Sequence, residues 1–198
     1  ERFDQPLRPR ETGRLNGDGY LLKKMVYETH PGIIVSALLY LPDPLVDRMP
    51  AIQVCHSHHR PKDQGELQDM GVIWARSGCA VLIPDLLGHG ERKEDPFGGR
   101  QGYYSRYYSA MQLNLQGESL TGWMIRDLSR GNELLLDIPG VDPERLIAIG
   151  SVAGGGDLAA ILTALDRRVT CSIPFNFGSG GAWRADLGTP PPDGVNLA

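Results

Sequence analysis

The sequence predicts an α/β fold in which a mostly parallel sheet, flanked by helices, is entered by an antiparallel strand pair. From residue 51 onward, strand-like and helix-like segments alternate, which is the pattern of a parallel sheet with helices packed on it. Several strand-like segments are short and apolar throughout, as expected for strands covered on both faces. Two strand-like segments joined by a tight turn precede the alternation.

The antiparallel pair is expected over residues 21–28 and 33–41, which are rich in apolar residues and flank the turn Thr29-His30-Pro31-Gly32. Residues 1–19 are polar and contain glycine, as is typical of an N-terminal arm. Residues 20–198 are then expected to form one domain, because a chain of 198 residues has the usual length of a single domain.

The alternating part is read from periodicity and from breaker residues. Leu67, Met70 and Trp74 recur at helical spacing before Gly78, and a longer amphipathic pattern ends at Pro139-Gly140. The segment near 91–118 contains glycines and a tyrosine cluster, and is expected to be an irregular lid insertion. The expected strands are 51–55, 79–84, 145–149 and 169–173, and the expected helices are 66–77, 120–138 and 158–165.

Composition excludes several classes of protein. The chain has 24 acidic and 20 basic side chains and a net charge of −4, so its composition predicts no nucleic-acid partner, which would require a clustered basic face. No apolar run approaches the roughly 20 residues of a membrane span. The three cysteines, Cys55, Cys79 and Cys171, lie in apolar runs at wide spacing, which predicts small buried side chains and no disulfide framework or zinc site. The cellular compartment is not predicted.

The chemistry is expected at one edge of the sheet. In open α/β sheets, ligands bind beyond the carboxyl ends of the strands. The loops 56–65, 85–118 and 150–156 all leave those ends.

The turn Gly150-Ser151-Val152-Ala153-Gly154-Gly155-Gly156 lies between an expected strand and an expected helix. This is the setting of a nucleophile elbow, where the backbone of the attacking residue is strained and its neighbours must be small. The following residue donates its N–H to the oxyanion. The alternative is a glycine-rich phosphate turn at a helix N-terminus, but the spacing fits neither GxGxxG nor a P-loop with its lysine.

Five motifs occur in an order that resembles the acetyl xylan esterase-like branch of the α/β-hydrolases, over roughly residues 20–184. They are HSHH (56–59), PDLLGHGER (84–92), the elbow, ALDRRV (164–169) and SIPFNFG (172–178). The stretch GSGGAWR (178–184) is also similar to glucuronoyl esterases. The resemblance implies a sheet of α/β-hydrolase type and hydrolysis of a carboxylic ester. It further implies an acylated carbohydrate substrate such as acetylated xylan, attack by a serine, and no metal or organic cofactor.

The attacking serine is missing from the elbow. Alignment on the triple glycine and ALDRRV puts Ala153 at its position, whereas alignment on GxSxG alone puts Val152 there. Three explanations stay open. The serine was replaced to trap a substrate, the protein naturally lacks it, or Ser151 serves through an unusual elbow. The second explanation corresponds to a non-catalytic homologue that binds a carbohydrate or another partner.

The general base is also missing, because all five histidines precede Ala153 and none follows it. In α/β-hydrolases the histidine comes last in the triad. Where some glucuronoyl esterases carry an acid after the sixth strand, this chain has Asn176, and Asp186 and Asp193 lie in a Gly/Pro-rich tail. We therefore expect this chain to be the N-terminal part of a longer hydrolase, so that its own fold is incomplete at the C-terminus.

The string His56-Ser57-His58-His59 has three interpretations. In the family, this loop supplies the second oxyanion N–H, from around His58 or His59, which would pair with the N–H of Gly154. As a metal site, His56, His58 and His59 would hold a zinc ion in a metal-dependent hydrolase, but Arg60 and Pro61 stand where that signature needs Asp and His. The third interpretation is a plain polar loop.

Substrate contacts are predicted at His89, Tyr103 and Tyr107. His89 lies between two turn glycines and either borders the site or is part of the loop structure. The tyrosines at 103, 104, 107 and 108 either stack on sugar rings, pack a lid against the body, or form a contact in a homo-oligomer. Asp157 is expected to stabilise the N-terminus of its helix through its negative charge.

Overall fold

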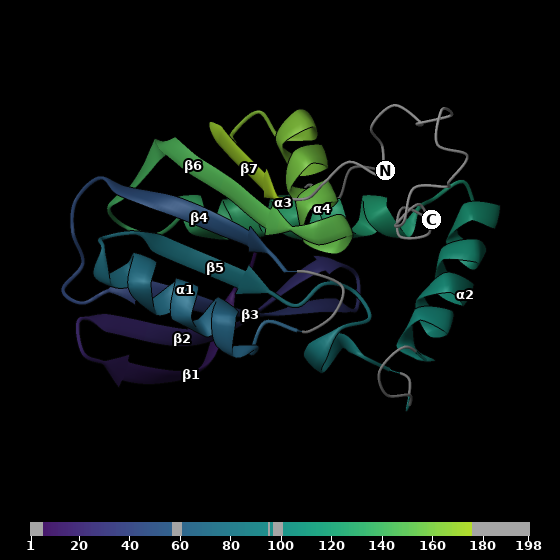
Figure 1. Cartoon of the computed structure of the whole chain (residues 1–198), viewed down its shortest axis with the longest axis horizontal. Coiled ribbons are helices and arrows are strands. Elements are labelled where there is room, and N and C mark those ends of the chain that lie inside the picture. The colour runs from purple at the N-terminus through teal and green to yellow at the C-terminus, as the bar shows by residue number, and fades with distance from the viewer. Residues whose placement is uncertain (1–5, 57–60, 95, 97–100, 176–198) are drawn as a thin grey trace, which may run out of the picture.

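The computed structural model describes residues 6–56, 61–94, 96 and 101–175, except for the side chains of 101–104 and 153. Its strands are β1 (Arg10–Gly17), β2 (Tyr20–His30), β3 (Ile33–Pro42), β4 (Met49–Cys55), β5 (Ala80–Pro84), β6 (Val141–Ser151) and β7 (Cys171–Phe175). Its helices are α1 (Gly65–Arg76), α2 (Gln101–Leu115), α3 (Leu120–Leu136) and α4 (Val152–Leu165), with a 3-10 turn, η1 (Gly90–Arg92). Figure 1 shows these elements.

The described strands form one mixed sheet in the order β1-β2-β3-β5-β4-β6-β7. Strands β5, β4, β6 and β7 are parallel to one another, and β1, β2 and β3 join them through antiparallel pairings. The predicted fold class, an α/β sheet flanked by helices and entered by antiparallel strands, is confirmed. The antiparallel part is larger than a strand pair, because β1 adds a third strand.

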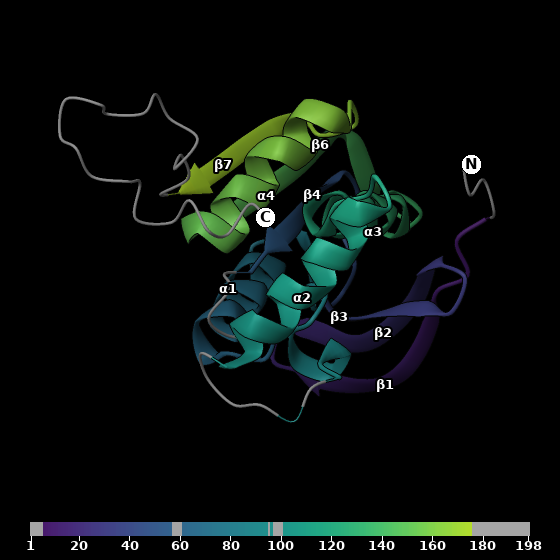
Figure 2. The same cartoon turned by 90° about the vertical axis from the view of Figure 1, so that its right-hand side faces the viewer.

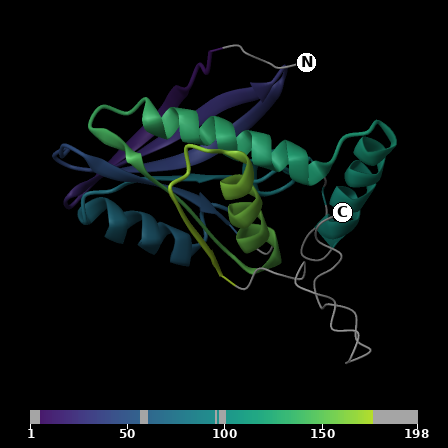
Figure 3. The ribbon, with the colours of Figure 1, turned by 90° about the horizontal axis from the view of Figure 1, so that it is seen from above.

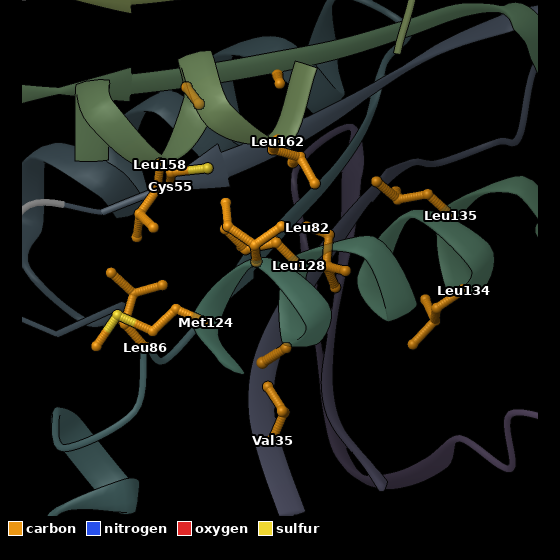
Figure 4. Packing of buried hydrophobic residues seen from close by; sticks show 14 of the residues in the cluster. Val35, Cys55, Leu82, Leu86, Met124, Leu128, Leu134, Leu135, Leu158 and Leu162 are labelled. Atoms are coloured by element: carbon orange, nitrogen blue, oxygen red, sulfur yellow. The ribbon is translucent and has the colours of Figure 1, made fainter. Parts of the chain in front are cut away.

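Apolar clusters cover both faces of the sheet. On one face, side chains of α3 and α4 such as Leu128, Leu158 and Leu162 pack against Cys55 and Leu82 of the central strands (Figure 4). On the other face, Leu67 and Ala75 of α1 belong to a second cluster with strand residues. Figure 3 shows α1 and α3 on opposite sides of the sheet. The mainly apolar strands β4 and β5 fit this arrangement, since they are covered on both sides.

Two segments differ from the expectations in their type of secondary structure. Residues 10–17, expected within an arm, form the edge strand β1, whose polar side chains suit an edge that faces solvent. Residues 101–115, expected to be irregular, form helix α2, because this stretch contains a single glycine and no proline to interrupt a helix. The burial prediction for the cysteines is confirmed for Cys55, holds only in part for the half-buried Cys79, and is wrong for Cys171, which is exposed on β7.

The carboxyl ends of β4, β5 and β6 lie at one edge of the sheet, and α2 stands beyond that edge (Figures 1 and 2). The elements that follow these strands, including η1 and the start of α4, therefore gather in one region. Among the described residues, no helix combines the length and the apolar character that crossing a membrane requires.

Candidate active site

The turn between β6 and α4 has the backbone strain of an elbow. Ser151 ends the strand in an extended conformation, and Val152 begins the helix with a φ of 55°. A β-branched residue with positive φ is a genuine outlier and costs on the order of 1–3 kcal/mol. The strained position therefore falls on Val152, the residue that the GxSxG alignment selects.

Glycines allow this turn to pack closely. A Cβ atom on Gly155 would lie 2.3 Å from the carbonyl oxygen of Cys55, at the end of the neighbouring strand β4. A Cβ atom on Gly150 would lie 3.0 Å from the same oxygen. Any side chain at these two positions would force helix α4 away from the strands. The glycine spacing is thus explained by the contact between helix and strand.

A cavity of about 870 Å³ adjoins the elbow. Ser151 and Val152 line it together with His56, at the end of β4, and Phe175, at the end of β7. The start of α1 forms another wall, through Gln64, Gly65, Glu66 and Leu67. Ser151 is exposed, so a hydroxyl group lies directly beside the strained residue within this cavity.

His56 connects the ends of two strands. Its ring is buried, and its Nε2 accepts a hydrogen bond of 2.9 Å from the backbone N–H of Leu86, just after β5. This nitrogen is therefore unprotonated and already engaged. The ring of His89 lies edge-on to it at 5.1 Å, and His89 is itself only 7% exposed. Of the two, only His56 is among the residues that line the cavity, and His89 packs against it.

A group of charges centred on the buried side chains of Lys62 and Asp85 lies next to these histidines. Lys62 Nζ donates to the Asp85 carboxylate, to Glu91 Oε2 at 2.6 Å and to Ser36 Oγ at 3.4 Å. Asp85 also accepts from the backbone N–H groups of Lys62 and Glu91. Burial acts to raise the pKa of Asp85, but the hydrogen bonds and charge of Lys62 outweigh it and hold the pKa below its ordinary value.

The turn η1 is held on its other side by a second buried ion pair. Arg92 Nη1 lies 2.7 Å from Asp127 Oδ2 of α3 and donates to the carbonyl oxygen of Asp85 at 3.0 Å. A Cβ atom on Gly90 would lie within 2.4 Å of the Asp85 carboxylate. The DLLGHGER motif therefore connects the loop that leads into α1 with helix α3.

The predicted site residues are brought together only in part. Ser151 lines the cavity, and Gly154 is half-buried in the first turn of α4. Tyr107 is 48% exposed on α2, and it is not among the residues that line the elbow cavity. Four predictions lie outside what the structure describes, namely the residues His58 and His59 and the side chains of Ala153 and Tyr103.

The sequence reasoning missed the charged group around Lys62. Its members come from three separate segments of the chain, with Ser36 in β3, Lys62 after β4, and Asp85 and Glu91 together in the motif after β5. The polar string after β4 and the motif 84–92 were visible in the sequence, but no spacing rule connects them. In the described part of the chain, no three His, Cys, Asp or Glu side chains are arranged to hold a metal ion.

Comparisons with known proteins agree with this architecture. A family model described as Acetyl xylan esterase (AXE1) matches residues 6–191. A search of curated proteins found no match. The fold is similar to that of an acetyl xylan esterase from Paenibacillus sp. R4, with a TM-score of 0.72 and 19% identity over 98% of this chain and 62% of that one.

Two further solved structures extend the comparison. Acetyl xylan esterase 1 from Thermoanaerobacterium sp. JW/SL YS485 has a TM-score of 0.65 and 18% identity over 94% of this chain and 58% of that chain. Methylesterase BT1017 has a TM-score of 0.63 and 25% identity over 84% of this chain and 34% of that chain. The chain thus spans less than two thirds of the length of each of these structures.

Proposed function

The chain belongs to the acetyl xylan esterase family, with an α/β-hydrolase fold, and from this premise we propose that it acts on acyl esters of carbohydrates. The proposed activity is hydrolysis of a carboxylic ester, with acetylated xylan as the model substrate. The proposed ester site is the cavity that the elbow residues Ser151 and Val152 line. No metal or organic cofactor is part of the proposal.

One observation carries the proposal, which is the left-handed backbone of Val152 at the cavity wall. Strain of this kind persists only where the surrounding structure enforces it, and it clusters at functional sites. Here Gly150 and Gly155 allow the close packing that holds it. A merely structural link between a strand and a helix does not require a β-branched residue with positive φ.

The reaction proposed for this type of site proceeds through an acyl-enzyme. A hydroxyl oxygen attacks the ester carbonyl carbon, the bond from that carbon to the sugar oxygen breaks, and the sugar oxygen takes up the proton that the hydroxyl loses. Water then attacks the acyl carbon, the bond to the enzyme oxygen breaks, and the acid and the free hydroxyl group are released. Backbone N–H groups at the start of α4 are suited to the oxyanion, because they lie at the positive end of the helix dipole.

Val152 favours a second candidate, which is binding of the ester without cleavage. An isopropyl side chain has no atom that can attack a carbonyl carbon, and Ser151 is the hydroxyl beside it in the cavity. Hydrolysis by this sequence would therefore depend on Ser151. A protein that retained the cavity without a working nucleophile would bind acylated sugars and release them unchanged.

The test measures acetate release and ligand binding on the same preparation. Hydrolysis predicts that the protein releases acetate from acetylated xylan and that Ser151→Ala abolishes the release. Binding without cleavage predicts no acetate, together with a calorimetric affinity for acetylated xylo-oligosaccharides that exceeds the affinity for deacetylated ones. Absence of both release and binding would contradict both candidates.

A further inference from the structure

We propose that Lys62 is a positioning residue for the ester cavity, through its bonds to Asp85 and Glu91. The inference rests on the proposed function, since it concerns the same cavity. Lys62 does not line that cavity. It lines the neighbouring groove of about 950 Å³, so its effect on the ester site must act through the segment that follows it.

The geometry fixes Lys62 at two points. Its backbone N–H donates to Asp85 Oδ1 at 3.0 Å, and its Nζ binds the other oxygen of the same carboxylate. Asp85 is itself held by the Ser36 hydroxyl at 3.0 Å. One carboxylate thus holds both the main chain and the side chain of Lys62 against the ends of β3 and β5.

The segment after Lys62 carries this restraint to the cavity. Gln64 N–H donates to the Pro61 carbonyl oxygen, and Leu67 N–H donates to the Gln64 carbonyl oxygen, so the segment runs directly into the first turn of α1. Gln64 through Leu67 line the ester cavity. A shift of Lys62 would therefore move one wall of the cavity relative to Ser151.

Burial makes the restraint sensitive to charge. The side chain of Lys62 is 8% exposed and that of Asp85 is 0% exposed, whereas that of Glu91 is 74% exposed. Removal of the Lys62 charge would leave the Asp85 carboxylate buried beside Glu91 without a cation, which is strongly unfavourable. The segment around Lys62 that leads into α1 would then separate from η1 and admit water to the carboxylate. The exposed Glu91 adds a second bond that can be removed at a smaller cost.

The test compares Lys62→Met and Lys62→Arg with a control, Arg76→Met. The control removes an exposed ion pair with Asp18 at the C-terminal end of α1, the helix that Lys62 precedes. The ligand-free readout is amide hydrogen exchange in a peptide over residues 61–70. We expect exchange in Lys62→Met to rise about tenfold there and little in α3 and α4, because the opening is local. Arg76→Met should match the wild type over residues 61–70.

The second readout is the dissociation constant for an acetylated xylo-oligosaccharide. It is expected to rise about tenfold in Lys62→Met, to recover partly in Lys62→Arg, and to stay unchanged in Arg76→Met. If Lys62→Met does not fold, Glu91→Gln replaces it, with smaller shifts of both readouts in the same directions.

The two failures are distinguishable. If the wild type binds no ester, the proposed function fails, and with it the role of Lys62 at an ester site. Hydrogen exchange would still report whether Lys62 holds the segment. Wild-type exchange over residues 61–70 in a folded Lys62→Met variant would overturn the positioning role, and so would an equal rise across the whole chain.

Discussion

A Cβ atom placed on Gly150, at the end of β6, would lie only 2.0 Å from the carbonyl oxygen of Gly155 in α4. The strand and the helix that follows it therefore touch through bare backbone at the elbow. The close approach sets the backbone of the residues between them, including the strained Val152.

The first prediction concerns Gly155→Ala. The new methyl group would meet the Cys55 carbonyl oxygen, and the free energy of unfolding should fall by about 3 kcal/mol, as in strongly overpacked cores. Gly65→Ala is the matched control, because it is also a helical glycine but has no atom within 4 Å of the added Cβ. Urea unfolding should show less than about 1 kcal/mol of change for this control. Equal effects of the two substitutions would refute close packing at the elbow.

The second prediction concerns the strain at Val152. Glycine adopts a positive φ without steric cost, so Val152→Gly relieves backbone strain. This gain should offset most of the stability lost with the half-buried valine side chain and with the greater entropy of the unfolded chain. The free energy of unfolding is expected to change by less than about 1 kcal/mol. Val26→Gly, at a half-buried valine of strand β2, should cost about 2 kcal/mol. A comparable loss in both variants would mean that Val152 is not strained in solution.

The third prediction distinguishes the two alignments of the elbow. Val152→Ser places a hydroxyl on the strained residue, whereas Ala153→Ser places one a residue later, within α4. We expect p-nitrophenyl acetate to acetylate Val152→Ser faster than Ala153→Ser, as detected by intact mass and peptide mapping. Preferential acetylation of Ala153→Ser would assign the nucleophile position to residue 153 instead.

The fourth prediction concerns acid stability. Burial acts to raise the pKa of Asp166, but hydrogen bonds from Arg168 and Asn132 lower it to about 2, from an ordinary value of 3.8. Since the folded state favours the charged form of Asp166, this carboxylate stabilises the fold at pH values above its ordinary pKa. The stabilisation disappears as the pH falls toward 2. At neutral pH, Asp166→Asn should lower the free energy of unfolding by on the order of 2 kcal/mol.

Urea titrations of this pair at several pH values check the sign. The difference between wild type and Asp166→Asn should shrink between about pH 4 and pH 2. A difference that grows as the pH falls would contradict the arrangement of Arg168 and Asn132 around this carboxylate.

Much of the fold could be predicted from the sequence, because the central strands and the amphipathic helices carry their own periodic signals. The run that became β5 is apolar throughout, and it lies in the middle of the sheet. Strand β1 could not be recognised, since its polar residues do not distinguish an edge strand from a loop. Helix α2 contacts the body mainly through α3, so its sequence has little apolar periodicity to read.

The candidate site was predictable to the level of the glycine turn. Spacing alone allowed either Val152 or Ala153 to occupy the strained position, and only the backbone angle separates them. The bonds of Lys62 to Asp85 and Glu91 depend on how loops from different strands meet in space. Such contacts leave no periodic trace in the sequence, which explains why the residues that hold the site together were missed.

The most direct test of the central claim is calorimetric titration of the protein with an acetylated xylo-oligosaccharide and with the same oligosaccharide after deacetylation. If the elbow cavity recognises the acyl ester, the acetylated ligand should bind about tenfold more tightly. Ser151→Trp, which places an indole ring in the cavity beside Val152, should abolish that preference, and Glu144→Trp, at the exposed far end of the same strand, should keep it. Equal affinities for the two ligands, or a preference that survives in Ser151→Trp, would contradict an ester site at the elbow.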